Sequence, residues 1–104
     1  MASGVYGKSA LAATTMTEIV AAPTSGIKIA SVSVCNRTSS ELTLRLAIAG
    51  AAGSVADADY IEYDVKIPGN GVLERSGLVL SAGNGLMAYA SDAGLSVVAY
   101  GVDG

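Results

Sequence analysis

Apolar and polar residues alternate with a period of two through the middle of the chain. This is the spacing of a β-strand that buries one face, whereas an amphipathic helix needs apolar spacings of three and four. Residues 42–49 place these apolar side chains on one face: Leu42, Leu44, Leu46 and Ile48. Residues 60–67 do the same with a second set: Ile61, Tyr63, Val65 and Ile67. Because every charged residue of both segments falls on the opposite face, we predict two strands, with Tyr63 in the core.

Residues 27–34 are also apolar and rich in β-branched side chains, but their alternation changes phase. The first apolar side chains, Ile27 and Ile29, share one face, and those that follow from Ala30 onward share the opposite face. A β-bulge near residues 30–31, or a strand buried on both faces, would explain this change.

Turn-forming Gly, Asn, Pro and Asp residues separate the apolar runs at fairly even intervals, and two Gly-Asn-Gly triplets lie between runs as hairpin connections do. Further candidate strands are residues 15–22, 78–80, 86–90 and 95–102. Residues 50–58 are weakly patterned and are predicted to form an exposed loop. The result is seven or eight short strands without a helix longer than a turn. We therefore predict an all-β chain, an antiparallel β-sandwich of the Ig-like or jelly-roll kind.

Residues 1–14 consist mostly of small residues, with Val5, Tyr6 and Leu11 as the larger apolar ones. We predict an N-terminal arm over residues 1–14 and a single sandwich domain over residues 15–104. Such an arm can become ordered in an assembly by adding to the sheet edge of a neighbour. The alternative is simple terminal disorder.

The composition is unusually poor in charge for a chain that is not a membrane protein. Of 104 residues, 51% are hydrophobic and 14% are charged, against about 25% charged in a typical soluble domain. The apolar runs reach about ten residues, half of what a spanning helix needs, and no secretory signal is evident. An apolar exterior is usually covered by neighbouring subunits, so the composition favours a protein that works inside an assembly.

Several function classes are disfavoured by what the chain lacks. The net charge is −3, whereas a nucleic-acid-binding surface needs a basic stripe. There is no His, which removes the most common general base and metal ligand. Cys35 is the single cysteine, so no internal disulfide forms, and we interpret it as a small apolar residue rather than a reactive thiol. The Asn36-Arg37-Thr38 glycosylation pattern is interpreted as accidental. We predict synthesis in a cytoplasm and no enzymatic activity.

Three candidate sites remain. Four acids lie close together in the sequence: Asp57, Asp59, Glu62 and Asp64. Their spacing does not fit a calcium loop, so we interpret them as a solvated strand face and loop and predict no metal, cofactor or catalytic residue. Tyr60 is either an interface anchor or an ordinary exposed ring. Arg45 is expected to pair with a carboxylate on a neighbouring strand or another subunit. The predicted interface residues are Val5, Tyr6, Leu11, Arg45 and Tyr60.

The chain from residue 11 to its end resembles the small β-sandwich virion proteins of tailed bacteriophages. The residues that carry this resemblance are Leu11-Ala12-Ala13-Thr14-Thr15, Cys35-Asn36-Arg37-Thr38, Asp59-Tyr60-Ile61, Asp64, residues 71–83 and the closing Ala99-Tyr100-Gly101-Val102-Asp103. These are strand and turn motifs, and the resemblance supplies no catalytic residues.

The resemblance implies a capsid cement or decoration protein that resides in the virion and binds the major capsid protein or other virion proteins. By the same resemblance, we expect a homo-oligomer, with a trimer as the expected form. The alternatives are a tail, baseplate or fibre component of the virion and, third, a carbohydrate-binding module. An enzyme ranks last, because the sequence has no His and no catalytic motif.

Overall fold

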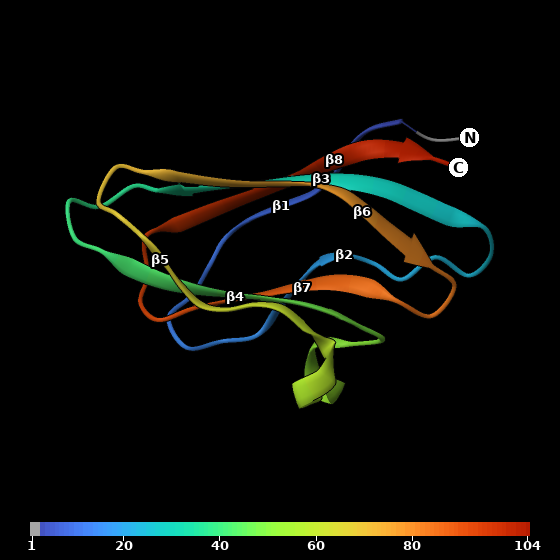
Figure 1. Ribbon diagram of the computed structural model, residues 1–104, viewed down its shortest axis with the longest axis horizontal. Helices are drawn as coiled ribbons and strands as arrows, with labels where there is room; N and C mark the ends of the chain where they lie inside the picture. The colour runs from blue at the N-terminus through green and yellow to red at the C-terminus, as the bar shows by residue number, and fades with distance from the viewer. Residues whose placement is uncertain (1–2) are drawn as a thin grey trace.

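Two four-stranded antiparallel sheets face each other in the computed structural model, which describes residues 3–104 (Figure 1). The strands are β1 (Ser3–Ala10), β2 (Thr17–Val20), β3 (Ile27–Asn36), β4 (Leu42–Ala49), β5 (Tyr60–Ile67), β6 (Val72–Ser81), β7 (Gly85–Ala90) and β8 (Leu95–Asp103). Two single-turn 3-10 helices, Ala52–Ser54 and Asp57–Asp59, lie between β4 and β5. The predicted antiparallel sandwich is confirmed. Within residues 3–104, no helix is long and apolar enough to cross a membrane.

The strand order identifies which kind of sandwich this is. One sheet, called sheet A here, has the order β1-β8-β3-β6, and the other, sheet B, has the order β2-β7-β4-β5. Strands β1 and β8, β2 and β7, β3 and β6, and β4 and β5 are all hydrogen-bonded antiparallel pairs. The chain is thus one long hairpin of four strand pairs that is rolled up until β8 meets β3 and β7 meets β4. This is the jelly-roll arrangement rather than the Ig-like one.

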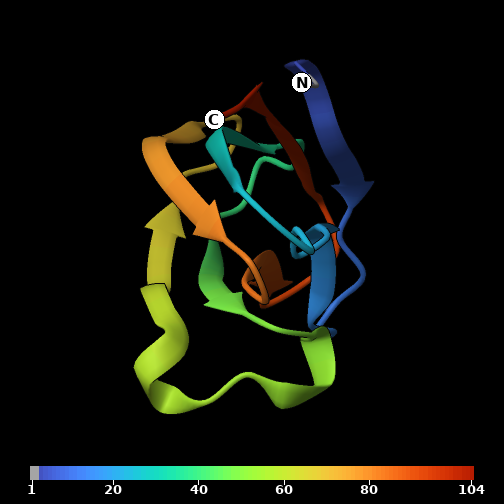
Figure 2. The ribbon, with the colours of Figure 1, turned by 90° about the vertical axis from the view of Figure 1, so that its right-hand side faces the viewer.

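The core fills the space between the sheets, as the alternation of residues 42–49 predicts. Leu42, Leu44 and Leu46 of β4 are buried there. They meet inward side chains of sheet A, among them Val32 and Val97. Figure 2 shows the sandwich turned by 90°, with the loop between β4 and β5 passing beneath sheet B. A second, small cluster forms where this loop covers Ala47 and Met87 on the outer side of sheet B.

The expected N-terminal arm is part of the sandwich instead. Strand β1 pairs with β8 of its own chain, and Leu11, at 2% exposed, lies in the core. A Cβ placed on Gly7 would lie 2.0 Å from the carbonyl oxygen of Ile19, so β1 packs closely against β2. The sequence hid this strand because a bulge at Tyr6 interrupts its alternation.

Each of the four edge strands carries at least one register irregularity. The extra residue lies in the edge strand every time, in β1, β2, β5 and β6. In β6 the irregularity includes Gly77, whose φ is +73°. Bulges twist an edge away from a flat template, and natural sheets use them to prevent pairing with another chain. The edges of this sandwich are therefore poor sites for strand addition, contrary to what the arm interpretation proposed.

Strand β3 alternates regularly, so the bulge predicted near residues 30–31 is wrong. The irregularity at this level lies in the partner strand β6. Ala30 points into the core, whereas Ile27 and Ile29 point outward and are exposed. The change of phase in the sequence therefore reflects apolar residues on the outer surface.

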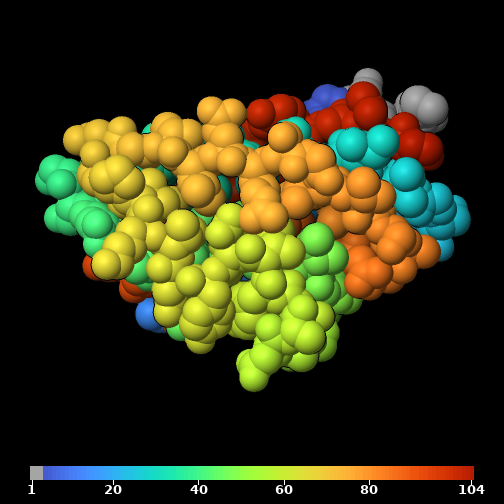
Figure 3. Space-filling view, viewed as in Figure 1, coloured from blue at the N-terminus to red at the C-terminus, as the bar shows by residue number. Residues whose placement is uncertain are grey.

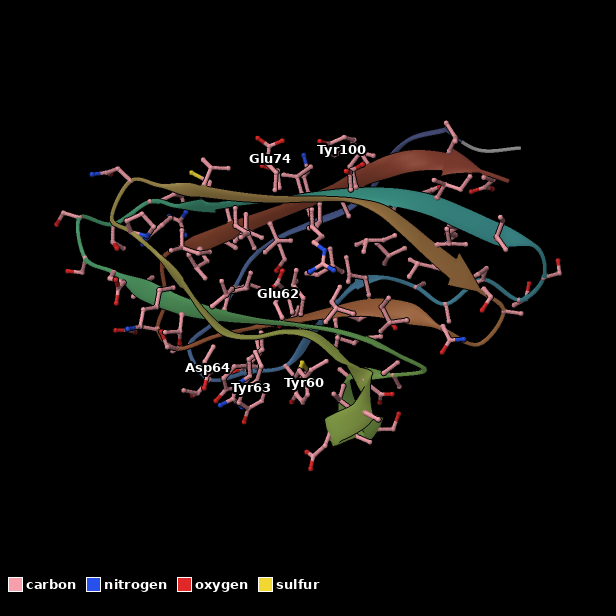
Figure 4. All side chains as sticks on the ribbon, in the orientation of Figure 1. Tyr60, Glu62, Tyr63, Asp64, Glu74 and Tyr100 are labelled. Carbon is pink, nitrogen blue, oxygen red and sulfur yellow. The ribbon has the colours of Figure 1, made fainter. Side chains whose placement is uncertain are left out.

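Strand β5 also departs from its prediction. Two irregularities against β4, near Ile61 and between Glu62 and Val65, reset its alternation. Asp64 adopts a positive φ of 53° within the second of them. As a result Tyr63 is 60% exposed rather than in the core, and Glu62 points between the sheets while Asp64 points away from them (Figure 4).

Among the residues whose burial the structure describes, 4–104, one polar side chain is fully buried, that of Asn36 at the end of β3. Its Nδ2 donates to the carbonyl oxygens of Ser40 at 2.8 Å and Ile67 at 3.1 Å. Its Oδ1 accepts from the backbone N–H and the hydroxyl of Thr38. The side chain therefore ties the turn after β3 to the end of β5, and its burial leaves no room for a glycan.

Candidate functional site

Most of the large apolar side chains that are exposed in the described part of the chain lie together on the outer face of sheet A. This cluster, called the sheet A patch here, consists of Val5, Ile27, Ile29, Val79, Tyr100 and Val102. Its members are between 36% and 64% exposed. Ile29 is opposite Val79 on one side and Val102 on the other, and Tyr100 is opposite Val5, so the patch is continuous across all four strands. Exposed apolar clusters of this kind mark contact surfaces.

Charge is absent from the middle of this face. The outward positions of β3 and β8 carry only apolar side chains, serines and Cys35. Lys8 on β1 and Glu74 on β6 stand on the two edge strands. Figure 4 shows Glu74 and Tyr100 pointing away from the sandwich on the same side. A partner surface that fits this face is therefore apolar and poor in charge as well.

The outer face of sheet B has a different chemistry, built around Arg45. Its Nε lies 2.7 Å from Oδ1 of Asp64 and its Nη2 lies 3.3 Å from Oδ2, a two-point contact with one carboxylate. The guanidinium also lies over the ring of Tyr63 at 4.2 Å and that of Tyr89 at 4.9 Å. The hydrogen bond from Arg45 lowers the pKa of Asp64, and the same contact raises the pKa of Arg45. The predicted pairing of Arg45 with a carboxylate on a neighbouring strand is confirmed.

A shallow hollow of about 470 Å³ lies beside this cluster and is lined by Asp57, Tyr60 and Tyr63. The two rings meet edge to face, with centroids 4.9 Å apart and planes at 83°. Tyr60 also packs on the small cluster around Ala47 and Met87, which holds its ring in place. Tyr60 and Tyr63 lie together below sheet B in Figure 4, and the loop that carries Asp57 projects from the molecule in Figure 3.

The four acids of this region do not converge. Glu62 forms an ion pair with Arg75 of β6, between the two sheets, whereas Asp64 pairs with Arg45 outside them. Asp59 accepts a hydrogen bond from the backbone N–H of Ala56. In the described part of the chain, no three side chains of the metal-ligating types gather in one place.

The predicted interface residues fall in different environments. Val5 belongs to the sheet A patch, and Arg45 and Tyr60 belong to the cluster on sheet B. Leu11 is a core residue and is not accessible to a partner, which corrects its prediction. Tyr6 is half-buried, and its hydroxyl donates a hydrogen bond to Oδ1 of Asp103 at 2.7 Å. Burial, together with this carboxylate, raises the pKa of Tyr6 to about 12.

Sequence reasoning missed two parts of these surfaces. It placed Tyr63 in the core, because bulges cannot be read from alternation. It also missed the sheet A patch. The change of phase at Ile27 and Ile29 was the feature of the sequence that indicated apolar residues on the outer face.

Comparisons of the chain with protein-family models, with curated proteins and with solved structures found no match. The strand order makes the described chain an eight-stranded jelly roll, with an apolar outer face on sheet A and an aromatic, charged outer face on sheet B.

Proposed function

We propose that this chain is a structural protein of a tailed-phage virion, a capsid cement or decoration protein that binds across neighbouring major capsid subunits. The observation that carries the proposal is the sheet A patch, a continuous apolar surface without charge at its centre. Jelly rolls occur in viral capsid domains and also in lectins. The fold is therefore compatible with the proposal but does not by itself distinguish a capsid protein from a lectin.

The proposed mechanism is mass action. Burial of the patch against capsid subunits adds contacts that rupture or expansion of the shell must break, so bound copies shift the equilibrium toward the intact shell. A specific interface of this kind buries upwards of about 1,000 Å². Because the four edge strands are bulged, the proposed contact is made by the face of sheet A and not by strand addition at an edge.

The test is binding of the purified chain to virions from which it has been deleted, measured by co-sedimentation. We expect saturation at hundreds of copies per particle and little change in affinity between low and high salt. Saturation at a handful or a few dozen copies would favour the alternative, a tail, baseplate or fibre component. No binding to any part of the particle would refute a virion function. Sedimentation analysis of the free chain tests the expected trimer.

A pair of matched variants tests the surface itself. Val102→Lys places an ammonium group in the patch, whereas Val72→Lys makes the same change at an exposed position of sheet A outside it. An ammonium group loses its hydration when an apolar interface closes over it. We therefore expect the Val102 variant to bind virions at least about tenfold more weakly and the Val72 variant to bind like the unchanged protein. Equal binding by both variants would show that another surface makes the contact.

A further inference from the structure

We propose that the hollow formed by Asp57, Tyr60 and Tyr63 binds the guanidinium group of an arginine side chain from a partner protein. Two aromatic rings and a carboxylate line this hollow. Aromatic faces attract cations through their quadrupole, and a carboxylate beside them adds charge and a hydrogen-bond acceptor. The site lies on the face of the sandwich opposite the sheet A patch, so it does not rest on the function proposed for that patch.

The neighbouring cluster shows that this surface already holds a guanidinium in the same way. Arg45 lies over Tyr63 and makes a two-point contact with Asp64. The hollow shares Tyr63 with this cluster and adds the ring of Tyr60 and the carboxylate of Asp57. Asp57 forms no ion pair or hydrogen bond with another side chain in the described part of the chain.

The local charge also favours a cation over an anion. Asp64 compensates Arg45, so the Arg45 guanidinium does not leave a free positive charge beside the hollow. Asp57 is the one acidic residue among the three that line the hollow. The chain as a whole carries a net charge of −3, which attracts a basic side chain from a distance.

The ring geometry argues against a saccharide, the other ligand that tyrosines commonly bind. A sugar chain stacks on exposed ring faces that lie in a common plane, whereas these two rings stand at 83° to each other. Arg45 also lies over Tyr63 at 4.2 Å, which covers one face of that ring. A corner of this shape fits a small planar cation better than a flat sugar ring. Guanidinium is favoured over ammonium because its plane stacks on one ring while its fork meets the carboxylate.

The experiment is a titration of the isotopically labelled full chain, followed by NMR of the backbone amides and the tyrosine ring protons. The first probe is N-acetyl-arginine amide, and its uncharged counterpart is N-acetyl-citrulline amide, which has nearly the same shape. The third probe is maltotriose, a neutral oligosaccharide. We expect the arginine probe to shift signals of residues 57–63 in a saturable way, and the other two probes to leave them unchanged.

Two variants locate the effect. Asp57→Asn removes the charge at the hollow and keeps the shape, and we expect it to weaken arginine binding about three- to tenfold. Glu41→Gln removes one charge from an exposed residue in the turn between β3 and β4, and we expect it to leave binding unchanged. Both substitutions are at exposed positions, and the dispersion of the amide spectrum shows directly that each variant is folded.

Four results would overturn the proposal. Citrulline shifts equal to those of arginine would show that the charge is irrelevant. Equal binding by the Asp57 and Glu41 variants would place the site elsewhere. Saturable shifts with maltotriose alone, or no saturable shift with any probe, would exclude an arginine site at this hollow. None of these results bears on the sheet A patch, whose binding to virions is measured separately.

Discussion

Replacement of Asn36 by leucine removes the amide that joins three segments of the sandwich. Leucine has a similar size and shape, so the cavity stays filled and the change isolates the hydrogen bonds. The carbonyl of Ile67 loses its bond in a buried setting, where an unsatisfied polar group costs about 1–3 kcal/mol. The partners in Thr38 and Ser40 are nearer to solvent, and the Thr38 hydroxyl still donates to the Ser40 carbonyl, so each lost bond there costs about 1 kcal/mol or less.

The expected loss of unfolding free energy for Asn36→Leu is therefore about 3 kcal/mol. This is a large part of the roughly 5–15 kcal/mol by which a domain is stable, and it corresponds to a fall in Tm of roughly 10–20 °C. Urea denaturation followed by far-UV circular dichroism measures the loss. The matched control is Asn84→Leu, because the Asn84 amide donates only to the exposed Ser81 hydroxyl. A loss below about 0.5 kcal/mol for Asn36→Leu, or the same loss for both variants, would refute the reasoning.

Three further outcomes are expected. Because the pKa of Tyr6 is about 12 when folded and about 10 when unfolded, its contribution to stability is complete below pH 10 and is lost as the pH rises toward 12. Tyr6→Phe, which also removes the bond to Asp103, should flatten that part of a stability–pH curve, and an unchanged curve would contradict this. Because Arg45 lowers the pKa of Asp64 in the folded chain, the ion pair stabilises the fold fully only above the pKa of Asp64 in the unfolded chain, about 3.9. This stabilisation is lost as the pH falls further and the carboxylate becomes protonated. Carboxyl NMR of Arg45→Met should show the pKa of Asp64 rising toward its ordinary value. If the pKa does not rise, the contact with Arg45 is not what lowers it. Gly101→Ala would place a Cβ 1.9 Å from a carbonyl oxygen of β3, so thermal unfolding should show a loss of about 2 kcal/mol or more; a variant as stable as the unchanged chain would mean that β3 and β8 separate easily.

The sandwich was predictable because strands such as β4 alternate buried side chains with more accessible ones over most of their length, which is what a period of two reports. Strand β4 follows this rule through Leu42, Leu44 and Leu46. Strand order was left open between two sandwich types, since it depends on pairings between distant segments. Alternation carries no information about those pairings.

The departures from prediction have local physical causes. In β5 the extra residues reset the phase after Tyr60, which brings Tyr63 to the surface beside it. In β1 the bulge at Tyr6 and the many small residues hid a strand that its own partner β8 completes. In β3 there is no irregularity, and the apparent change of phase comes from Ile27 and Ile29 on the outer face. Apolar residues were assigned to the core, although on this chain a substantial set of them faces outward.

The position of the exposed apolar side chains is stronger evidence for a contact surface than the high overall hydropathy. A chain with only 14% charged residues exposes apolar side chains wherever they lie, and scattered single residues need no explanation. Here six of them form one surface on sheet A, while the outer side of sheet B is covered by its own loop and by the Arg45 cluster. The bulged edges disfavour association by strand addition, which leaves the two outer faces as the surfaces proposed for contact. Since the faces are opposite and differ in chemistry, the contact proposed for sheet A and the arginine contact proposed for sheet B do not compete for the same surface. Two independent contacts of this kind would allow the proposed cement protein to link the subunits of a shell and not merely coat them.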